Sequence, residues 1–107
     1  IYIDDLVSSI TKVIGAKSKI NGEIINIGAG QSHPLNFIVE MVLENIPTAR
    51  RELIHYGALA YREHECMSYA VNIDHAFKII NWLPITDLQS GLCNTIKHYS
   101  KLYYEAI

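Results

Sequence analysis

The sequence predicts an α/β domain with a few short strands and about four helices. Two patterns indicate this class. Apolar residues recur at helical spacing in four stretches, and short apolar runs bounded by turn residues stand between them. In order, these stretches predict the arrangement β-α-β-α-β-β-α-α. Because 107 residues suit one modest core and no repeat or Gly/Pro/Ser linker interrupts them, we expect a single domain over residues 1–107.

The composition is that of an ordinary soluble globular protein, with 50% apolar residues, 19% charged residues and a formal net charge of −2. So small a charge argues against nucleic acid or an acidic membrane surface as a partner. No apolar run approaches the ~20 residues of a membrane span, and no basic-then-apolar leader precedes Ile1. The two cysteines, Cys66 and Cys93, form no disulfide or zinc pattern, which favours a cytoplasmic location.

The N-terminal segment predicts a strand that leads into a helix. Residues 1–3 ("IYI") have the character of a strand end, and Asp4 or Asp5 is placed to accept hydrogen bonds at a helix N-terminus. The helix is expected to end near Gly15. Its predicted apolar face comprises Leu6, Ile10, Val13 and Ile14. Because the chain opens inside a predicted strand and lacks an initiator methionine, we expect it to be part of a longer protein.

Residues 20–57 continue the alternation of predicted strands and helices. A turn at Asn21 and Gly22 precedes the apolar run 24–27, which suits a strand buried on both faces. A helix is then predicted over residues 32–46, with Ser32 as its cap. Pro34 is tolerated in its first turn, and Pro47 stops it. The segments 51–57 and 67–73 predict two more strands.

Two helices are predicted in the last third of the chain. Asp74 is expected to cap a short helix that runs to Ile80. Thr86 and Gln89 match a capping box in front of a long final helix. The residues repeated at helical spacing along that helix are Leu88, Leu92, Ile96, Tyr99 and Tyr103.

The stretch "INIGAGQSH" resembles part of a dinucleotide-binding fingerprint. A predicted strand leads into Gly28-x-Gly30, a helix follows, and Glu52 lies at about the right distance downstream. The third glycine, which close packing of helix on strand requires, is replaced by His33. A tight glycine turn is therefore favoured over a cofactor loop, and no cofactor-binding residues are predicted.

Metal binding and nucleophilic catalysis have weak signals. The five histidines, at positions 33, 55, 64, 75 and 98, include no HxxxH pair. His64 lies between Glu63 and Glu65, and a lone histidine among acidic residues is more typical of a solvated loop than of a metal site. Cys66 lies two residues from His64, a spacing that sends side chains apart in an extended segment. We predict neither metal ligands nor catalytic residues.

Arg62 and Glu65 are the strongest candidates for ligand binding. A guanidinium presents a rigid fork of donors that suits phosphate or carboxylate. Glu65, three residues on, could accept hydrogen bonds from a pair of sugar hydroxyls, so that the two side chains would contact both ends of a ribose-phosphate unit. The alternative is a surface ion pair worth under about 1 kcal/mol.

Four segments resemble, in order, the C-terminal portion of the NAD-dependent epimerase/dehydratase family, the extended short-chain dehydrogenases that act on nucleotide sugars. They are "IYIDDLVSSI", "GEIINIGAGQSHPL", "IHYGALAYREHE" and "VNIDHAFKIINWLPITDLQSGLCNTIKHY". The order of the segments is more specific than any one of them. The resemblance implies a C-terminal substrate-binding lobe of Rossmann-type α/β fold, without its N-terminal NAD-binding part.

The resemblance also implies roles for three residues. In that family an arginine at the position of Arg62 holds the nucleotide diphosphate, and an acid at that of Glu65 contacts the ribose. Tyr61 could stack on the base or simply pack. The implied ligand is a nucleoside-diphosphate sugar, and NAD or NADP would serve the complete enzyme without binding to this fragment.

The family's Tyr-x-x-x-Lys pair occurs nowhere in the chain. Without that phenol and lysine, the chain alone is expected to be inactive in hydride transfer. Whether the parent performs epimerisation, dehydration or ketosugar reduction stays open. So does a different class of function, a stand-alone nucleotide-binding or protein-interaction module, in which exposed apolar surface favours a homo-oligomer.

Overall fold

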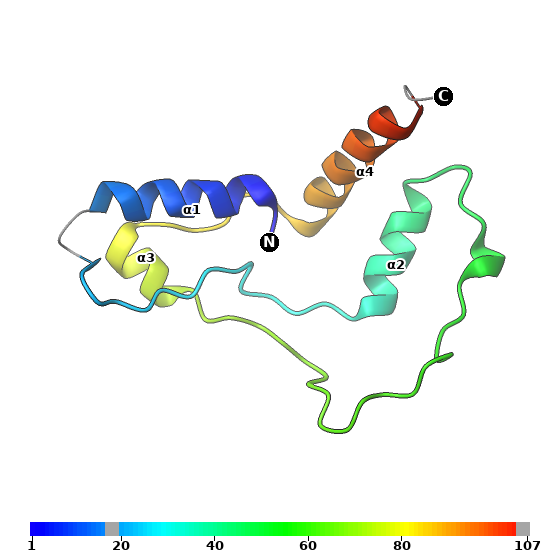
Figure 1. Ribbon diagram of the computed structural model, residues 1–107, viewed down its shortest axis with the longest axis horizontal. Helices are drawn as coiled ribbons and strands as arrows, with labels where there is room; N and C mark the ends of the chain where they lie inside the picture. The colour runs from blue at the N-terminus through cyan, green and yellow to red at the C-terminus, as the bar shows by residue number, and fades with distance from the viewer. Residues whose placement is uncertain (17–19, 105–107) are drawn as a thin grey trace. The chain divides into compact units, whose positions relative to one another are not determined.

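The computed structural model describes residues 1–16 and 20–104. Its regular elements are helical: α1 (Ile3–Ala16), α2 (Leu35–Glu44), the short 3-10 helix η2 (Arg51–Leu53), α3 (Asp74–Ile80) and α4 (Leu88–Tyr104) (Figure 1). No strand occurs in the described ranges. The predicted α/β, Rossmann-type class is therefore wrong, and this chain is a small all-helical protein with long irregular connections.

The segments predicted as strands have strand-like sequences but form no hydrogen-bonded ladder in the described part of the chain. Residues 24–27 and 67–73 are irregular, and Ile3 already belongs to α1. Residues 28–30 do pass close to residues 71–73, because a Cβ placed on Gly28 would lie 3.2 Å from Val71. Apolar and β-branched residues favour an extended chain, but a strand is completed only by a neighbour that accepts its N–H groups.

The chain forms two compact units. The first contains residues 1–31 and 70–91, with α1, α3 and the first turn of α4. The second contains residues 32–69 and 92–107, with α2, η2 and the rest of α4.

The core of the first unit lies where α1 packs on α3. Of the described residues, the hydrophobic side chains of Ala76, Ile80 and Trp82 are buried there. The partly buried residues around them are Val13, Ala16, Ile20, Ile25, Ile27, Ile73 and Ile79. Asn81 ends α3 in the left-handed conformation, with a φ of 49°, and its carbonyl accepts a hydrogen bond from the Lys12 ammonium.

Asp5 and Ser9 are the buried polar side chains of α1, with exposed fractions of 2% and 1%. The Asp5 carboxylate accepts hydrogen bonds from the backbone N–H groups of Ile85, at 3.1 Å, and Thr86, at 3.0 Å. The predicted apolar face is only partly right, because Ile10 and Ile14 of that set are exposed. The face that α1 buries thus includes a carboxylate that binds the chain leading into α4.

In the second unit, α2 and α4 border a common groove. Val42 and Ile46 line a shallow apolar groove of about 430 Å³ together with Leu92 and Ile96 of α4. The Cys93 thiol of α4 donates to the Asn45 side-chain oxygen at 3.0 Å. The remainder of this unit is mostly irregular chain between α2 and residue 69.

The helices predicted from periodicity are confirmed, but their predicted caps are not. Pro34 occupies the N-cap position of α2, and the Ser32 hydroxyl instead accepts a hydrogen bond from the backbone N–H of Tyr69. Asp74 is the first residue of α3, and its N–H donates to the Asn72 side chain. These side chains form contacts that sequence spacing alone does not specify.

The cap of α4 lies one residue later than predicted. Asp87, not Thr86, accepts from the backbone N–H of Ser90, with an oxygen–nitrogen distance of 2.7 Å. The Ser90 hydroxyl donates to the second Asp87 oxygen at 3.1 Å. These hydrogen bonds, led by the one from the Ser90 amide, hold the pKa of the Asp87 carboxyl below its usual range. The Thr86 backbone N–H instead donates to the Asp5 carboxylate.

Candidate functional site

Arg62 and Glu65 form the two ends of one tight turn in the second unit. The Glu65 N–H donates to the Arg62 carbonyl at 3.1 Å, and the Arg62 N–H donates to Glu65 Oε2 at 2.9 Å. His64 sits inside the turn with a φ of 63°, in the left-handed region that most side chains avoid. Arg62 and Glu65 are therefore joined, as their three-residue spacing allows, by hydrogen bonds that their backbone N–H groups donate.

The side chains of this turn are open to solvent. Tyr61 is 76% exposed, and Arg62 and Glu65 are also exposed. Among the described residues, the Arg62 guanidinium forms no ion pair with Glu65 or with another carboxylate. Its donors are thus available to an anion, whereas one oxygen of Glu65 is already used within the turn. The stretch between the predicted strands 51–57 and 67–73 is irregular, and neither of those strands forms beside it.

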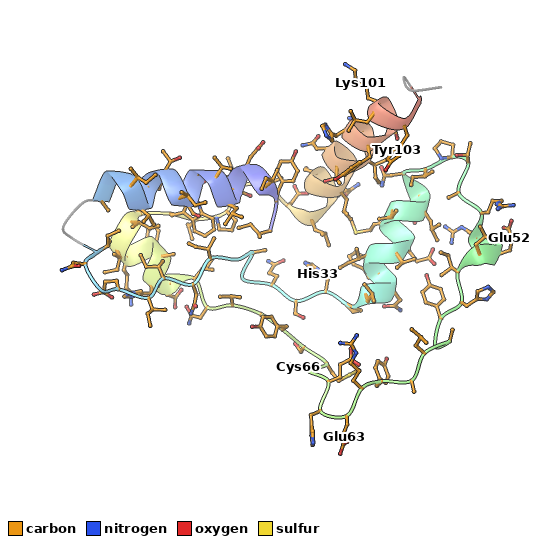
Figure 2. The ribbon with its side chains drawn as sticks, in the orientation of Figure 1. His33, Glu52, Glu63, Cys66, Lys101 and Tyr103 are labelled. Carbon is orange, nitrogen blue, oxygen red and sulfur yellow. The ribbon has the colours of Figure 1, made fainter. Side chains whose placement is uncertain are left out.

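The tip of the turn carries further polar side chains. In Figure 2, Glu63 points away from the loop. His64 lies 3.7 Å from the Glu63 carboxylate, and both side chains are more than nine-tenths exposed. The Cys66 thiol donates to the Ser68 carbonyl at 3.0 Å. Within the described ranges, no three His, Cys, Asp or Glu side chains gather in a way that could hold a metal ion.

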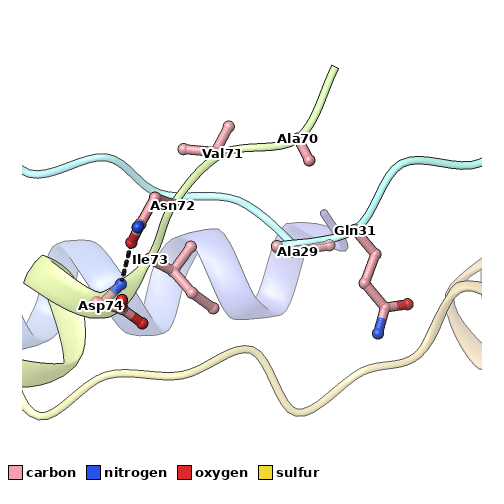
Figure 3. A pocket seen from close by; sticks show the side chains of 8 residues that line it. Ala29, Gln31, Ala70, Val71, Asn72, Ile73 and Asp74 are labelled. Carbon is pink, nitrogen blue, oxygen red and sulfur yellow. Dashed lines mark hydrogen bonds between the residues drawn. The ribbon is translucent and has the colours of Figure 1, made fainter. Parts of the chain in front are cut away.

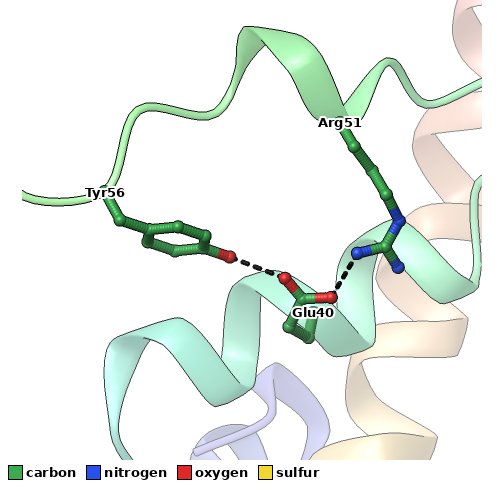
Figure 4. Close-up of polar contacts among 3 residues, drawn as sticks. All are labelled: Glu40, Arg51 and Tyr56. Atoms are coloured by element: carbon green, nitrogen blue, oxygen red, sulfur yellow. Dashed lines mark hydrogen bonds and ion pairs between the residues drawn. The ribbon is translucent and has the colours of Figure 1, made fainter.

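A cluster of three side chains lies at the start of this loop (Figure 4). Glu40 of α2 accepts from the Tyr56 hydroxyl at 2.8 Å through one oxygen and from the Arg51 guanidinium at 2.5 Å through the other. The hydrogen bond from Arg51, followed by that from Tyr56, lowers the pKa of Glu40. The hydrogen bond to Glu40 raises the pKa of Arg51 and that of Tyr56. Glu40 therefore stays ionised and paired.

The glycine segment borders a separate open pocket in the first unit, with a volume of about 530 Å³ (Figure 3). Its lining residues are Ala29, Gly30, Gln31, Ala70, Val71, Asn72, Ile73 and Asp74. Gly30 has a φ of 72°, which fits the predicted tight glycine turn. Glu52, the fingerprint's acidic candidate, is an exposed residue of η2 beside Arg50.

The residues present do not fit a dinucleotide cofactor. The anion site of such a fold is built from free N–H groups where a glycine loop opens into a helix. Here Pro34, which has no N–H, holds the N-cap position of α2. A Cβ on Gly28 or Gly30 would meet Val71 or Ile73, so those glycines accommodate packing of the chain on itself.

Comparison with known proteins points to enzymes that modify nucleotide sugars. The chain is 31% identical over 102 residues to "Uncharacterized UDP-glucose epimerase YtcB" of Bacillus subtilis (strain 168), a match that covers 95% of this chain and 31% of the relative. It is 26% identical over 92 residues to "CDP-abequose synthase" of Salmonella muenchen, covering 86% of this chain and 30% of the relative. The chain thus spans about a third of the length of these curated relatives.

These two matches at low identity support a relation of the chain to nucleotide-sugar enzymes. No family model matches the chain, and no solved structure matches it. Within the described residues, no helix is both long and apolar enough to cross a membrane.

Sequence reasoning missed the Glu40 cluster and the buried Asp5. Glu40 lies 11 residues from Arg51 and 16 from Tyr56, and because the three belong to α2, η2 and irregular chain, no periodicity within one element relates them. The sequence predicts Asp4 or Asp5 as a cap at the start of its own helix, whereas the partners of the Asp5 carboxylate lie 80 and 81 residues away. No local pattern could have identified either set.

Proposed function

We propose that this chain is the nucleotide-sugar-binding C-terminal part of an NAD(P)-dependent nucleoside-diphosphate-sugar epimerase, dehydratase or reductase. Similarity to the two sugar-nucleotide enzymes extends over most of the chain. The observation that carries the proposal is the turn at residues 62–65, which holds Arg62 and Glu65 on one short exposed segment and in which, among the described residues, the Arg62 guanidinium forms no ion pair. That pair of groups suits a diphosphate next to a ribose.

In this proposal, Arg62 binds the diphosphate, and Glu65 and Tyr61 orient the nucleoside. The guanidinium would donate two parallel hydrogen bonds to the diphosphate. The free oxygen of Glu65 would accept from a ribose hydroxyl, and the exposed ring of Tyr61 offers a face on which a base can stack. Binding energy from the nucleotide would hold the sugar in position for the reaction.

NAD or NADP would supply hydride transfer in the complete enzyme. Since the glycine segment of this chain does not fit a dinucleotide, the cofactor would be bound by residues outside residues 1–107. The chain is therefore proposed to contribute substrate binding and to be catalytically incomplete by itself.

Titration calorimetry of the full-length protein with UDP and with CDP tests this role. We expect Arg62→Ala to weaken the preferred nucleotide about tenfold or more, because charge-assisted hydrogen bonds are lost, and to leave NAD(H) affinity unchanged. Arg62→Lys should restore only part of the affinity, since an ammonium lacks the planar fork. Arg50→Ala, another exposed arginine of the same unit, is the matched control. Equal affinities in Arg62→Ala and the wild type would refute the proposal.

A second candidate is a stand-alone nucleotide-binding or protein-interaction module. Its support is the exposed apolar surface, for large side chains such as Ile24, Leu59 and Ile85 are at least 85% exposed. Such surface favours association with another chain or a homo-oligomer. Light scattering of the 107-residue chain over a range of concentrations distinguishes the cases. A mass that rises with concentration while UDP and CDP fail to bind would favour the protein-interaction module.

A further inference from the structure

We propose that Glu40 is a positioning residue for the turn at residues 62–65, acting by holding one end of the loop that carries it. This inference rests on the proposed function, since it assigns Glu40 to the same nucleotide-binding loop. The loop consists of residues 57–68 and is called here the 57–68 loop. One residue at each end of this loop is hydrogen-bonded to α2 or to the segment just before α2.

The first attachment is made by Glu40 alone. Its two carboxylate oxygens contact different side chains, Tyr56 Oη at 2.8 Å and an Arg51 guanidinium nitrogen at 2.5 Å (Figure 4). Tyr56 is the residue directly before the 57–68 loop. Glu40 lies in the middle of α2, so the start of the loop is fixed to a regular element.

The second attachment is made just before α2 begins. The backbone N–H of Tyr69, the residue directly after the 57–68 loop, donates to the Ser32 hydroxyl at 3.3 Å. Ser32 precedes Pro34, the N-cap residue of α2. Both ends of a 12-residue irregular stretch are thereby bound to one short part of the chain, residues 32–44.

Between these attachments the loop has little support of its own. Its residues are exposed, and its internal backbone hydrogen bonds include the one that closes the turn at Arg62 and Glu65. A loop whose ends are fixed has fewer conformations than one with a free end. Binding by a preorganised loop costs less ordering entropy, so the attachments should increase nucleotide affinity without touching the ligand.

The Glu40 contacts are suited to positioning the 57–68 loop, and they contribute little to the stability of the fold. The side chains of Glu40 and Arg51 are 41% and 59% exposed. Exposed ion pairs contribute little to the free energy of unfolding, because water screens them. Removing the carboxylate should therefore loosen the 57–68 loop while leaving the packed parts of the protein folded.

The test is a comparison of Glu40→Ala with Glu44→Ala in the full-length protein. Glu44 is an exposed glutamate one helical turn further along α2 and is the matched control. We expect Glu40→Ala to bind UDP or CDP several-fold more weakly and to exchange the backbone amides of residues 57–68 faster, with an unchanged unfolding midpoint. Tyr56→Phe, which removes one hydroxyl, should give a smaller change in the same direction. Unchanged exchange of residues 57–68 in both Glu40→Ala and Tyr56→Phe would overturn the proposal.

A double-mutant cycle with Arg62 separates positioning from a general structural effect. If Glu40 acts through Arg62, the loss of nucleotide affinity caused by Glu40→Ala should shrink or vanish in an Arg62→Ala background. Fully additive losses would refute positioning. The two proposals fail differently: an Arg62→Ala variant with normal affinity refutes the binding role, whereas normal affinity and exchange in Glu40→Ala alone refutes only the role of Glu40.

Discussion

The Trp82 indole N–H donates to the backbone carbonyl of Asp5 at 3.2 Å and also to the Ser8 hydroxyl at 2.8 Å. Trp82 is 1% exposed and follows α3, whereas Asp5 lies in the first turn of α1. The Asp5 carboxylate in turn accepts from the chain before α4. These two residues therefore join α1 to both segments that flank Pro84.

Replacing Asp5 by alanine should destabilise the protein. It would remove the acceptor of the Ile85 and Thr86 N–H groups, at a cost of about 1 kcal/mol for each hydrogen bond lost, because Ile85 is exposed and water can reach its amide. Urea denaturation measures the effect, and Asp4→Ala, an exposed neighbour in the same helix turn, is the control. Equal midpoints for the two variants would contradict this account of Asp5.

Stability should also fall in acid because of Asp5. Desolvation on burial would raise the pKa of its carboxyl, but the hydrogen bonds from the Ile85 and Thr86 groups outweigh it, so the pKa is lowered. A lowered folded-state pKa contributes stability above the unfolded value of about 3.9, and this is lost as pH falls through the folded value.

Urea midpoints measured between pH 3 and pH 7 test this dependence on Asp5. The wild type should lose stability below about pH 4 more steeply than Asp5→Asn, which cannot titrate. Parallel curves for the two proteins would show that other carboxyl groups, among them Glu40 and Asp87, account for the acid sensitivity.

The position of the α4 cap gives a third prediction. Asp87→Ala should lower the helix content and the thermal midpoint, because the Ser90 amide loses its acceptor. Gln89→Ala should have little effect, since the capping box predicted from Thr86 and Gln89 does not form. Circular dichroism compares the two variants, and a larger loss from Gln89→Ala would restore the predicted cap.

His64 provides a fourth test, at the turn itself. Its φ of 63° disfavours β-branched side chains and is readily adopted by glycine. We expect His64→Gly to keep nucleotide affinity and His64→Val to reduce it, because valine would open the turn that joins Arg62 to Glu65. The affinities for UDP and CDP measure this. An unaffected valine variant would mean that the turn is not needed in the bound state.

Sequence reasoning located the helices because their periodicity is a local property. Helices α1 and α4 form where apolar residues recur at helical spacing, although part of each predicted face, such as Ile10 and Ile14 of α1, is exposed. The predicted strands failed because a strand depends on distant partners that no short window contains. Ser32 shows the same limit on a smaller scale, since its hydroxyl contacts Tyr69 and not the helix that follows it.

The candidate site was predictable only in part. Residue types and the three-residue spacing singled out Arg62 and Glu65, but the turn that joins them, its hydrogen bonds from backbone amides and the left-handed His64 could not be read from the sequence. The Glu40 cluster joins residues across an irregular connection and required the structure.

Hydrogen exchange of the full-length protein, measured with and without UDP or CDP, tests the central claim most directly. If the turn at residues 62–65 binds the nucleotide, the amides of residues 57–69 should become protected when the nucleotide is added, and NAD alone should leave them unchanged. Protection confined to other parts of the protein, with residues 57–69 exchanging as before, would contradict the account.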